Sequence, residues 1–332
     1  MTTICFLIAL LCLVMYVVLD GYDLGLGIAT LLEPDAEHRH EMLEQVAQAW
    51  DGNETWLVLL AVSLWAGFPL AFGTLLPHAY LPVIVMLFSL IVRGVSVEMA
   101  SQAHPAPRWE RAFGVASLTA ALAQGVAAAT LTARLTVDAG AFSGSPFDAL
   151  GAYSALAAVT VASCYLTLGY GYTRWRTSGD LRARAGRRGT TSVVVSAVLV
   201  TASLVAADRT DAPLHLLHHQ RAWAAAGLLL VAVAGLAAGL LALRPGSAYD
   251  GLAFAGPVTA VVAVLLALVV TRYPVLAPPG LTVDRAVGPD HTMAFLAVGV
   301  GLNVPLVLYY NWFAHHAFRG KLTTRTGVGH DH

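Results

Sequence analysis

The sequence has few charged residues. They make up 12% of the 332 residues, while hydrophobic residues make up 57% and the mean hydropathy is +0.68. A soluble globular domain carries about 25% charged residues, so this composition excludes that class and indicates a polytopic membrane protein. The net charge of −1 leaves no basic surplus, and we expect no nucleic-acid partner.

Residues that hold metals and haem are also scarce at useful positions. The three cysteines, Cys5, Cys12 and Cys164, lie in apolar runs without a CxxC motif, which is typical of packing residues. A haem b site needs inward-facing His or Met ligands within helices. The histidines near the apolar runs instead fall at their ends or in loops, at His78, His215, His218, His219, His291, His315 and His316. We therefore expect this chain to bind no haem and no metal.

Long apolar runs fill most of the chain. With about 20 residues needed to cross a membrane, the sequence predicts an all-α membrane helix bundle of about nine transmembrane helices forming a single integral membrane domain, residues 1–332. The motif-bearing helices lie in 1–135, four more in 150–272, and the last in 291–318 with a short cytoplasmic tail. The spans are expected at about 4–32, 52–75, 78–100, 112–134, 150–173, 190–207, 222–243, 251–272 and 291–317.

The distribution of Lys and Arg predicts the orientation. A loop at 174–188 holds six arginines and is expected to be cytoplasmic. Counting outward from it, thirteen of the 19 Lys and Arg residues fall on its side of the membrane, five fall on the other, and Arg93 lies within a span. This asymmetry predicts an N-terminus outside and a C-terminus in the cytoplasm.

Acidic residues inside the first span are the first functional candidates. Asp20 and Asp23 are three residues apart and share a helix face near mid-membrane. They either join helices as protonated or paired carboxyls, or relay protons. The polar segment 33–49 that follows has apolar residues at helical spacing, which predicts a short amphipathic cytoplasmic helix.

The segment 50–57, WDGNETWL, concentrates polar and aromatic residues at a membrane boundary. Asp51 and Glu54 could form a D-x-x-E cap at a helix start or belong to a proton route, and the flanking Trp50 and Trp56 could be interface anchors.

Two further charges lie in the span at 78–100. Arg93 and Glu98 are five residues apart, so they point about 140° apart on a helix and are not expected to pair. Arg93 is permanently charged, and its partners should therefore lie on other helices or on another chain.

These motifs resemble subunit II of the cytochrome bd family of quinol oxidases. The family motifs TDGFDMG and WDGNQVWL correspond to LDGYDLG at 19–25 and WDGNETWL at 50–57, and SLFFRPVGFDYR aligns with SLIVRGVSVEM at 89–99. FRGK at 318–321 extends the resemblance to the far end. Here Glu54 replaces a glutamine and Gly94 replaces a proline.

The resemblance implies a haem-free second subunit of a quinol:oxygen oxidoreductase in the bacterial cytoplasmic (inner) membrane. The partner, a haem-bearing subunit I with haems b and d, would oxidise quinol and reduce O2 to water. A small single-helix subunit can accompany it, and a structural quinone or lipid is a further candidate ligand of this chain.

The resemblance also assigns residue roles. It implies a proton pathway through Asp51 with Trp56, joined by Glu54, Asp20 and Asp23. The residues expected at structural or interface positions are Trp50, Asn53, Arg93 and Glu98. No catalytic residue is expected in this chain.

A second interpretation is a proton-coupled secondary transporter that uses the same acids and Arg93 as its substrate or proton site. Such proteins often contain internal repeats and interrupted helices, and no convincing repeat is found here. Confinement of the membrane-embedded acids to the first three spans favours an accessory subunit.

The predicted orientation has a direct test. A reporter fused near Arg184 should be cytoplasmic and one fused near His218 should be extracytoplasmic, because of the Lys and Arg asymmetry. Alkaline phosphatase and green fluorescent protein fusions would measure this. The reverse pattern would place Asp51 on the wrong side for uptake of cytoplasmic protons.

Overall fold

The computed structural model describes residues 1–102, 105–130, 137–138, 141–145, 147–210, 221–277 and 280–317. The helices are α1 (Thr2–Leu32), α2 (Ala36–Ala47), α3 (Trp50–Gly67), α4 (Pro69–His78), α5 (Tyr80–Gln102), α6 (Pro107–Ala129), α7 (Ala152–Arg176), α8 (Gly179–Ala207), α9 (Ala222–Leu243), α10 (Asp250–Arg272), α11 (Val283–Ala286) and α12 (Asp290–Ala317). Two short antiparallel pairs, β1 (Val137–Asp138) with β2 (Ala141–Phe142) and β3 (Val275–Ala277) with β4 (Leu281–Thr282), lie in connections. The predicted all-α class is confirmed.

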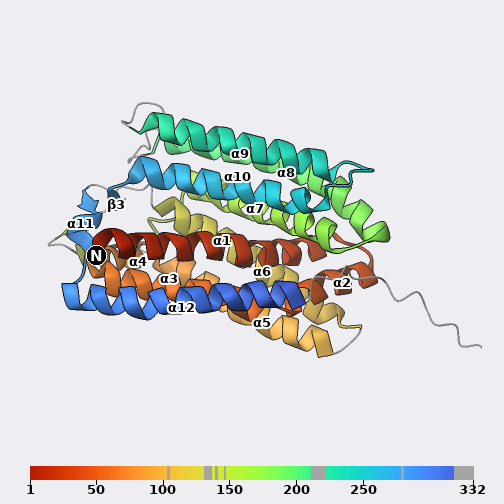
Figure 1. Ribbon diagram of the computed structural model, residues 1–332, viewed down its shortest axis with the longest axis horizontal. Coiled ribbons are helices and arrows are strands. Elements are labelled where there is room, and N and C mark those ends of the chain that lie inside the picture. Colours follow the sequence, from red (N-terminus) through yellow and green to blue (C-terminus); the bar gives the residue numbers. More distant parts are fainter. Residues whose placement is uncertain are drawn as a thin grey trace, which may run out of the picture.

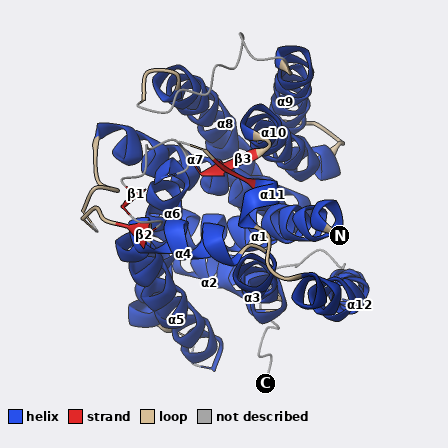
Figure 2. Cartoon of the chain, turned by 90° about the vertical axis from the view of Figure 1, so that its left-hand side faces the viewer, coloured by secondary structure: helices blue, strands red, loops and turns tan. Residues whose placement is uncertain are grey.

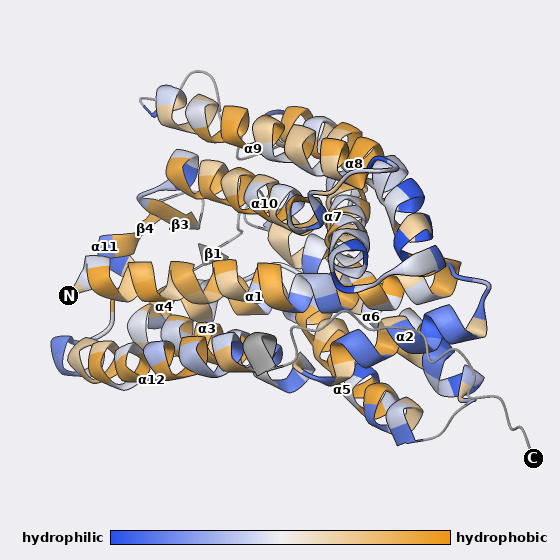
Figure 3. Ribbon diagram, turned by 45° about the vertical axis from the view of Figure 1, so that its right-hand side comes forward, coloured by the Kyte–Doolittle hydropathy of each residue, from blue (hydrophilic) through white to orange (hydrophobic). Residues whose placement is uncertain are grey.

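The long helices run side by side along the long axis of the molecule (Figure 1). In the end view α1 lies between α3 and α12 on one side and α7 and α10 on the other (Figure 2), and it packs directly against α3, α6 and α7. Hydrophilic residues gather at the end that holds α2 and the start of α8, whereas the helix lengths are largely hydrophobic (Figure 3). The first helix is therefore the centre of the bundle.

Eight helices among the described residues are long and apolar enough to cross a membrane. The span predicted at 52–75 differs from the others, because it consists of two helices, α3 and α4, that meet at Phe68. Pro69 occupies the first position of α4, where a proline starts a helix readily but cannot continue the preceding one. The predicted count of nine and the orientation of the termini stay predictions.

The arginine-rich segment predicted as a loop at 174–188 is helical, and that prediction is wrong. Arg174 and Arg176 belong to α7, α8 begins at Gly179, and only two residues separate the helices. The arginines have partners that make this possible. The buried Arg174 donates to the carbonyls of Ala242 and Arg244 at 3.1 and 3.0 Å, and Arg182 pairs with Asp250 at 2.7 Å.

The amphipathic helix predicted at 33–49 is confirmed as α2. Its apolar positions Met42, Leu43 and Val46 are buried. Asp35 is the N-cap residue and accepts the backbone N–H groups of Glu37 and His38. These bonds, that from His38 above all, lower the pKa of Asp35 from its ordinary value.

Helices α7 and α8 are joined by hydroxyl groups along their length. Thr160 bonds Ser203 at 2.7 Å, Ser163 bonds Ser196 at 2.8 Å, and Thr167 bonds the same Ser196 at 2.8 Å. Such bonds contribute about 0.6 kcal/mol each on average in a membrane, so the ladder adds specificity to contacts that are otherwise made by small apolar residues.

Helices α1 and α7 approach each other at backbone distance where both have glycine. A Cβ atom on Gly25 would lie 1.8 Å from the carbonyl oxygen of Tyr165, and one on Gly169 would lie 2.4 Å from the carbonyl carbon of Gly25. Small residues at such crossings let membrane helices pack closely. These two glycines therefore set the position of α1, and with it the acids that α1 carries.

Substituting Gly25 should separate these helices. Gly25→Ala is expected to lower the stability of the folded chain by about 3 kcal/mol or more, because backbone atoms on the other side cannot move aside as a side chain would. Monodisperse protein recovered in detergent and its thermal midpoint would measure the loss.

Gly227→Ala on α9 is the matched control, since nothing lies within 4 Å of a Cβ atom there. It should change stability by less than about 0.5 kcal/mol. Equal behaviour of the two variants would contradict the inferred close crossing.

Candidate functional site

A buried arginine joins three helices at the centre of the site. Arg93 on α5 is 0% exposed, and its Nη1 donates to Oδ1 of Asp20 on α1 at 2.6 Å. Its Nη2 donates to Oε1 of Glu54 on α3, whose side chain is 26% exposed. The prediction that the partners of Arg93 lie on other helices is confirmed. One cation thus holds two carboxylates from two segments of the chain.

The second acid of α1 is held by an amide. Nδ2 of Asn53 on α3 donates to Oδ2 of Asp23 at 2.8 Å and to the Tyr22 hydroxyl at 3.0 Å. Asn53 and Asp23 are both 0% exposed. Asn53 therefore fixes the start of α3 against α1 beside the ion pair made by Arg93.

The cluster contains more acid than base. Asp20 and Glu54 share the single guanidinium of Arg93, and Asp23 lies beside them on Asn53. Within the described residues Oδ2 of Asp20, Oδ1 of Asp23 and Nε of Arg93 have no hydrogen-bond partner. Since Arg93 keeps its proton under all ordinary conditions, proton uptake and release in this cluster fall to the carboxyls.

Asp51 lies outside the buried cluster. It is exposed in the first turn of α3, and its Oδ1 accepts the backbone N–H of Gly52 at 2.8 Å. The D-x-x-E cap is not formed, because the N-cap residue is Ala49 and Glu54 contacts Arg93 instead. Asp51 is thus an acid at the surface of this chain, one turn before the partly exposed Glu54.

The tryptophans of this segment pack against different neighbours, and a place for Trp56 in the proton pathway stays a prediction. The ring of Trp50 lies against Gly94, where a Cβ atom would be 3.0 Å from it. Trp56 is fully buried in an apolar group with Cys12 and Phe68, and its Nε1 has no hydrogen-bond partner among the described residues. Gly94 stands where the family motif has proline, and its missing side chain leaves room for the ring of Trp50.

Glu98 does not join the cluster. It is exposed on α5, and the ion pairs of Arg93 are made with Asp20 and Glu54 instead. The prediction that Arg93 and Glu98 do not pair is confirmed, and an interface role for Glu98 stays a prediction.

The sequence analysis missed a hydrogen-bonded chain beside Asp20. Nε2 of Gln124 on α6 donates to the Tyr16 hydroxyl at 2.7 Å, and the Tyr165 hydroxyl on α7 donates to Oε1 of Gln124 at 2.7 Å. The signal available in the sequence was a single amide within the apolar run at 112–134. Nothing in the sequence paired that amide with tyrosines more than a hundred residues upstream and about forty downstream.

A second missed residue is Glu33, at the end of α1. Its side chain is 0% exposed and accepts Arg184 at 3.1 Å and Arg188 at 2.9 Å. The first turns of α8 are thereby bound to the end of α1. This contact explains why the arginines of the segment are helical, and it gives them a structural role besides setting topology.

No group of three or more His, Cys, Asp or Glu residues suited to a metal ion occurs among the residues that the structure describes. The spaced histidines His215, His218 and His219 lie outside those residues, as do FRGK at 318–321 and the side chains of His315 and His316.

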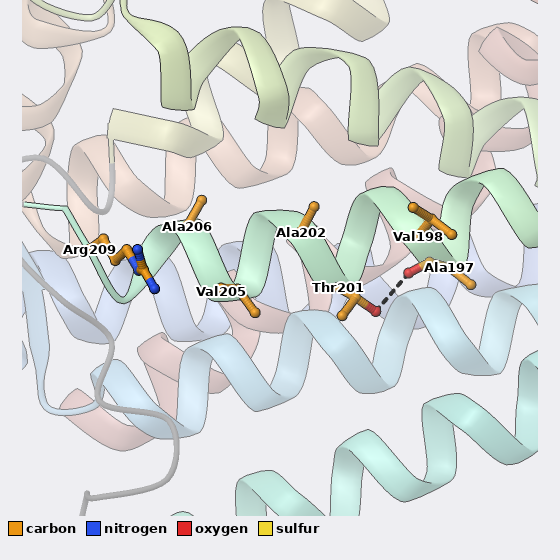
Figure 4. A pocket seen from close by; sticks show the side chains of 7 residues that line it. All are labelled: Ala197, Val198, Thr201, Ala202, Val205, Ala206 and Arg209. Carbon is orange, nitrogen blue, oxygen red and sulfur yellow. Dashed lines mark hydrogen bonds between the residues drawn. The ribbon is translucent and has the colours of Figure 1, made fainter.

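A surface hollow of about 770 Å³ lies against α8, away from the acids on α1, α3 and α5. Figure 4 shows one helix face, with the Thr201 hydroxyl bonded to the Ala197 carbonyl at 2.8 Å. The lining is apolar except for Thr201 and for Arg209, which follows the end of α8. The lining residues are Ala197, Val198, Thr201, Ala202, Val205, Ala206 and Arg209. It offers no titrating group for proton chemistry, so the buried acids remain the candidate site.

Comparison with known proteins identifies the family of this chain. The family of the cytochrome bd terminal oxidase subunit II matches residues 1–318. Cytochrome bd ubiquinol oxidase subunit 2 of Bacillus subtilis is 32% identical over 200 residues, which cover 58% of this chain and 59% of that protein. Cytochrome bd-I ubiquinol oxidase subunit 2 of Escherichia coli is 28% identical over 201 residues, covering 58% and 52%. The chain thus spans little more than half the length of these relatives.

A solved structure shares the fold. The structure of bd oxidase from Geobacillus thermodenitrificans contains a chain that superposes with a TM-score of 0.77 at 15% identity, covering 96% of this chain and 98% of that one. Together with the apolar helices, these matches make this a multi-pass protein of the bacterial cytoplasmic membrane. The chain belongs to the cytochrome bd terminal oxidase subunit II family.

Proposed function

We propose that this chain is the haem-free second subunit of a bd-type quinol:oxygen oxidoreductase, in which it stabilises a haem-bearing subunit I and lines a route for protons. The proposal rests on family membership and on one observation above the others. Three carboxyl groups from two helices gather around the buried Arg93, an arrangement that a helix facing only lipid has no reason to contain.

The route begins at the surface. Asp51 is exposed and Glu54, three residues further along α3, is partly exposed, so both lie on one face of the helix. Glu54 interacts electrostatically with Asp51 as well as with Arg93. A proton taken up at Asp51 can therefore pass to Glu54 at the edge of the cluster.

The route continues into the bundle through the carboxyls bound to Arg93. Asp20 shares the guanidinium with Glu54, and Asp23 lies one turn further along α1 behind Asn53. Arg93 orients these groups and balances their charge without losing its own proton. Protonation of one carboxyl changes the electrostatic potential at the others, and a proton relay requires this coupling.

Oxygen reduction itself would take place at the haems of the partner subunit, which supply the redox chemistry when bound there. This chain contributes the acids, the charge balance and a rigid helix bundle. The structural quinone or lipid and the small subunit stay predictions. The secondary-transporter alternative receives no support from the comparisons.

Purification through this chain tests the proposed function. Affinity purification from the native membrane should recover a haem-bearing subunit, and the reduced-minus-oxidised spectrum should show haems b and d. The same chain expressed alone should show no stoichiometric haem. A b-type spectrum from the isolated chain, or purification without a haem-bearing partner, would contradict the assignment.

Substituting Asp51 tests the proton route. In an assembled, haem-replete complex, Asp51→Asn should slow oxygen consumption by about tenfold or more, because it keeps the shape and removes the titrating group. Assembly should be nearly normal. Glu44→Gln is the control, since Glu44 is another exposed acid before the same span and pairs with His40. The turnover of this variant should equal that of wild type.

Arg93→Ala should fail in a different way. It leaves buried carboxylates without their cation, and breaking a buried pair costs about 3–5 kcal/mol, so complex should be lost before turnover per haem. Equal oxygen consumption per haem by Asp51→Asn and wild type would remove Asp51 from the route and leave Asp20 and Asp23 as the candidates.

A further inference from the structure

Asp20 has one carboxylate oxygen that Arg93 does not hold. Oδ1 accepts Nη1 of Arg93 at 2.6 Å, whereas Oδ2 is buried and has no hydrogen-bond partner among the described residues. A buried acceptor without a donor costs about 1–3 kcal/mol. A donor that can turn toward Oδ2 would therefore have a clear effect on where this carboxyl points and on how it holds a proton.

Tyr16 is the donor placed to do this. It lies four residues before Asp20 on the same face of α1, is 4% exposed, and its side chain interacts with that of Asp20. In the structure the Tyr16 hydroxyl donates to Sδ of Met86 at 4.0 Å. A thioether is a weak acceptor and a carboxylate is a strong one, so the carboxylate is the favoured partner of the Tyr16 proton.

The direction of the Tyr16 proton is set by its neighbours. The Tyr165 hydroxyl donates to Oε1 of Gln124, which fixes the amide so that Nε2 faces Tyr16 and donates to its oxygen. The Tyr16 hydroxyl already accepts from Gln124 and must send its own proton elsewhere. Gly21 permits this arrangement, because a Cβ atom there would lie 2.7 Å from the Tyr165 ring.

We propose that Tyr16, oriented by Gln124 and Tyr165, is a positioning residue that donates to Oδ2 of Asp20 and holds this carboxyl toward Arg93. The inference deepens the proposed function, because it assigns three further residues to the proton route. It also gives the route a boundary. An amide donates and accepts hydrogen bonds but does not titrate, so Gln124 ends proton exchange on the side of α6 and α7.

Tyr16→Phe tests the positioning role, because it removes the hydroxyl and keeps the ring. In the assembled, haem-replete complex, turnover should fall by about tenfold while the KM for quinol stays unchanged. The pH dependence of turnover should move to higher pH, because a carboxylate with one donor fewer takes up a proton more readily. Gln124→Met should shift both in the same direction by a smaller amount.

Tyr170→Phe is the matched control, since Tyr170 is a buried tyrosine of α7 outside this hydrogen-bonded chain. It should leave the turnover, the KM and the pH profile unchanged. An identical response in both phenylalanine variants would mean that loss of a buried hydroxyl acts only through general packing, and would overturn the proposal.

Infrared difference spectra with isotope-labelled aspartate provide a readout that does not depend on turnover. The carboxyl band removed by Asp20→Asn should move in Tyr16→Phe and stay in place in Tyr170→Phe. An unmoved band would overturn the proposal. A moved band with normal turnover would support the Tyr16 to Asp20 bond and contradict a proton route through Asp20, so the two proposals fail separately.

Discussion

The structure depends on keeping one permanent positive charge inside an apolar bundle. Arg93 cannot be neutralised and is 0% exposed, so its guanidinium must be matched by acids delivered from other helices. Asp20 binds α1 to this guanidinium, and Glu54 binds the start of α3 to it. The close crossing of α1 with α7 at Gly25 and Gly169 then sets where α1 can deliver its acid. Charge compensation and backbone packing thus determine the same helix position.

The middle and the end of α1 carry different kinds of contact. At mid-length the buried acids meet Arg93 and Asn53, whereas at its end Glu33 receives Arg184 and Arg188 from α8. The first contacts are made by fully buried side chains, for which an unpaired partner is costly. The second lie where hydrophilic residues gather (Figure 3), and their arginines are about one third exposed. The interior contacts are therefore the ones that any rearrangement of the helices must preserve.

Much of this could be predicted from the sequence, because an ionisable residue in an apolar run already requires a partner. This requirement identifies Asp20, Asp23, Asp51, Glu54 and Arg93 from the residues alone, and the motif resemblance adds the roles proposed for them. The sequence leaves open whether Glu54 belongs to a helix cap or to a proton route, since its contact with Arg93 depends on α5 lying beside α3. The charge of the segment 174–188 predicts a loop between two spans. In the structure, however, Arg174 and Arg182 are bound by carbonyls and an acid far away in sequence, so the segment is helical. The same limit applies to Tyr16, Gln124 and Tyr165. A neutral polar group in an apolar run does not require a charged partner, so their contacts cannot be predicted before the helices are placed side by side.

The ion pair between Asp20 and Arg93 also constrains how the chain is made. The two residues are 73 positions apart, and a bacterial ribosome adds roughly 5–20 residues per second, so Arg93 is synthesised about 4 to 15 seconds after Asp20. During that interval α1 must wait with two carboxyl groups in its middle and no cation to meet them. It can enter the membrane only with those groups protonated, or remain beside the translocation channel until α5 follows. The order of helices along the chain therefore leaves the first helix two ways to insert, with neutral carboxyls on its own or with charged carboxyls together with α5.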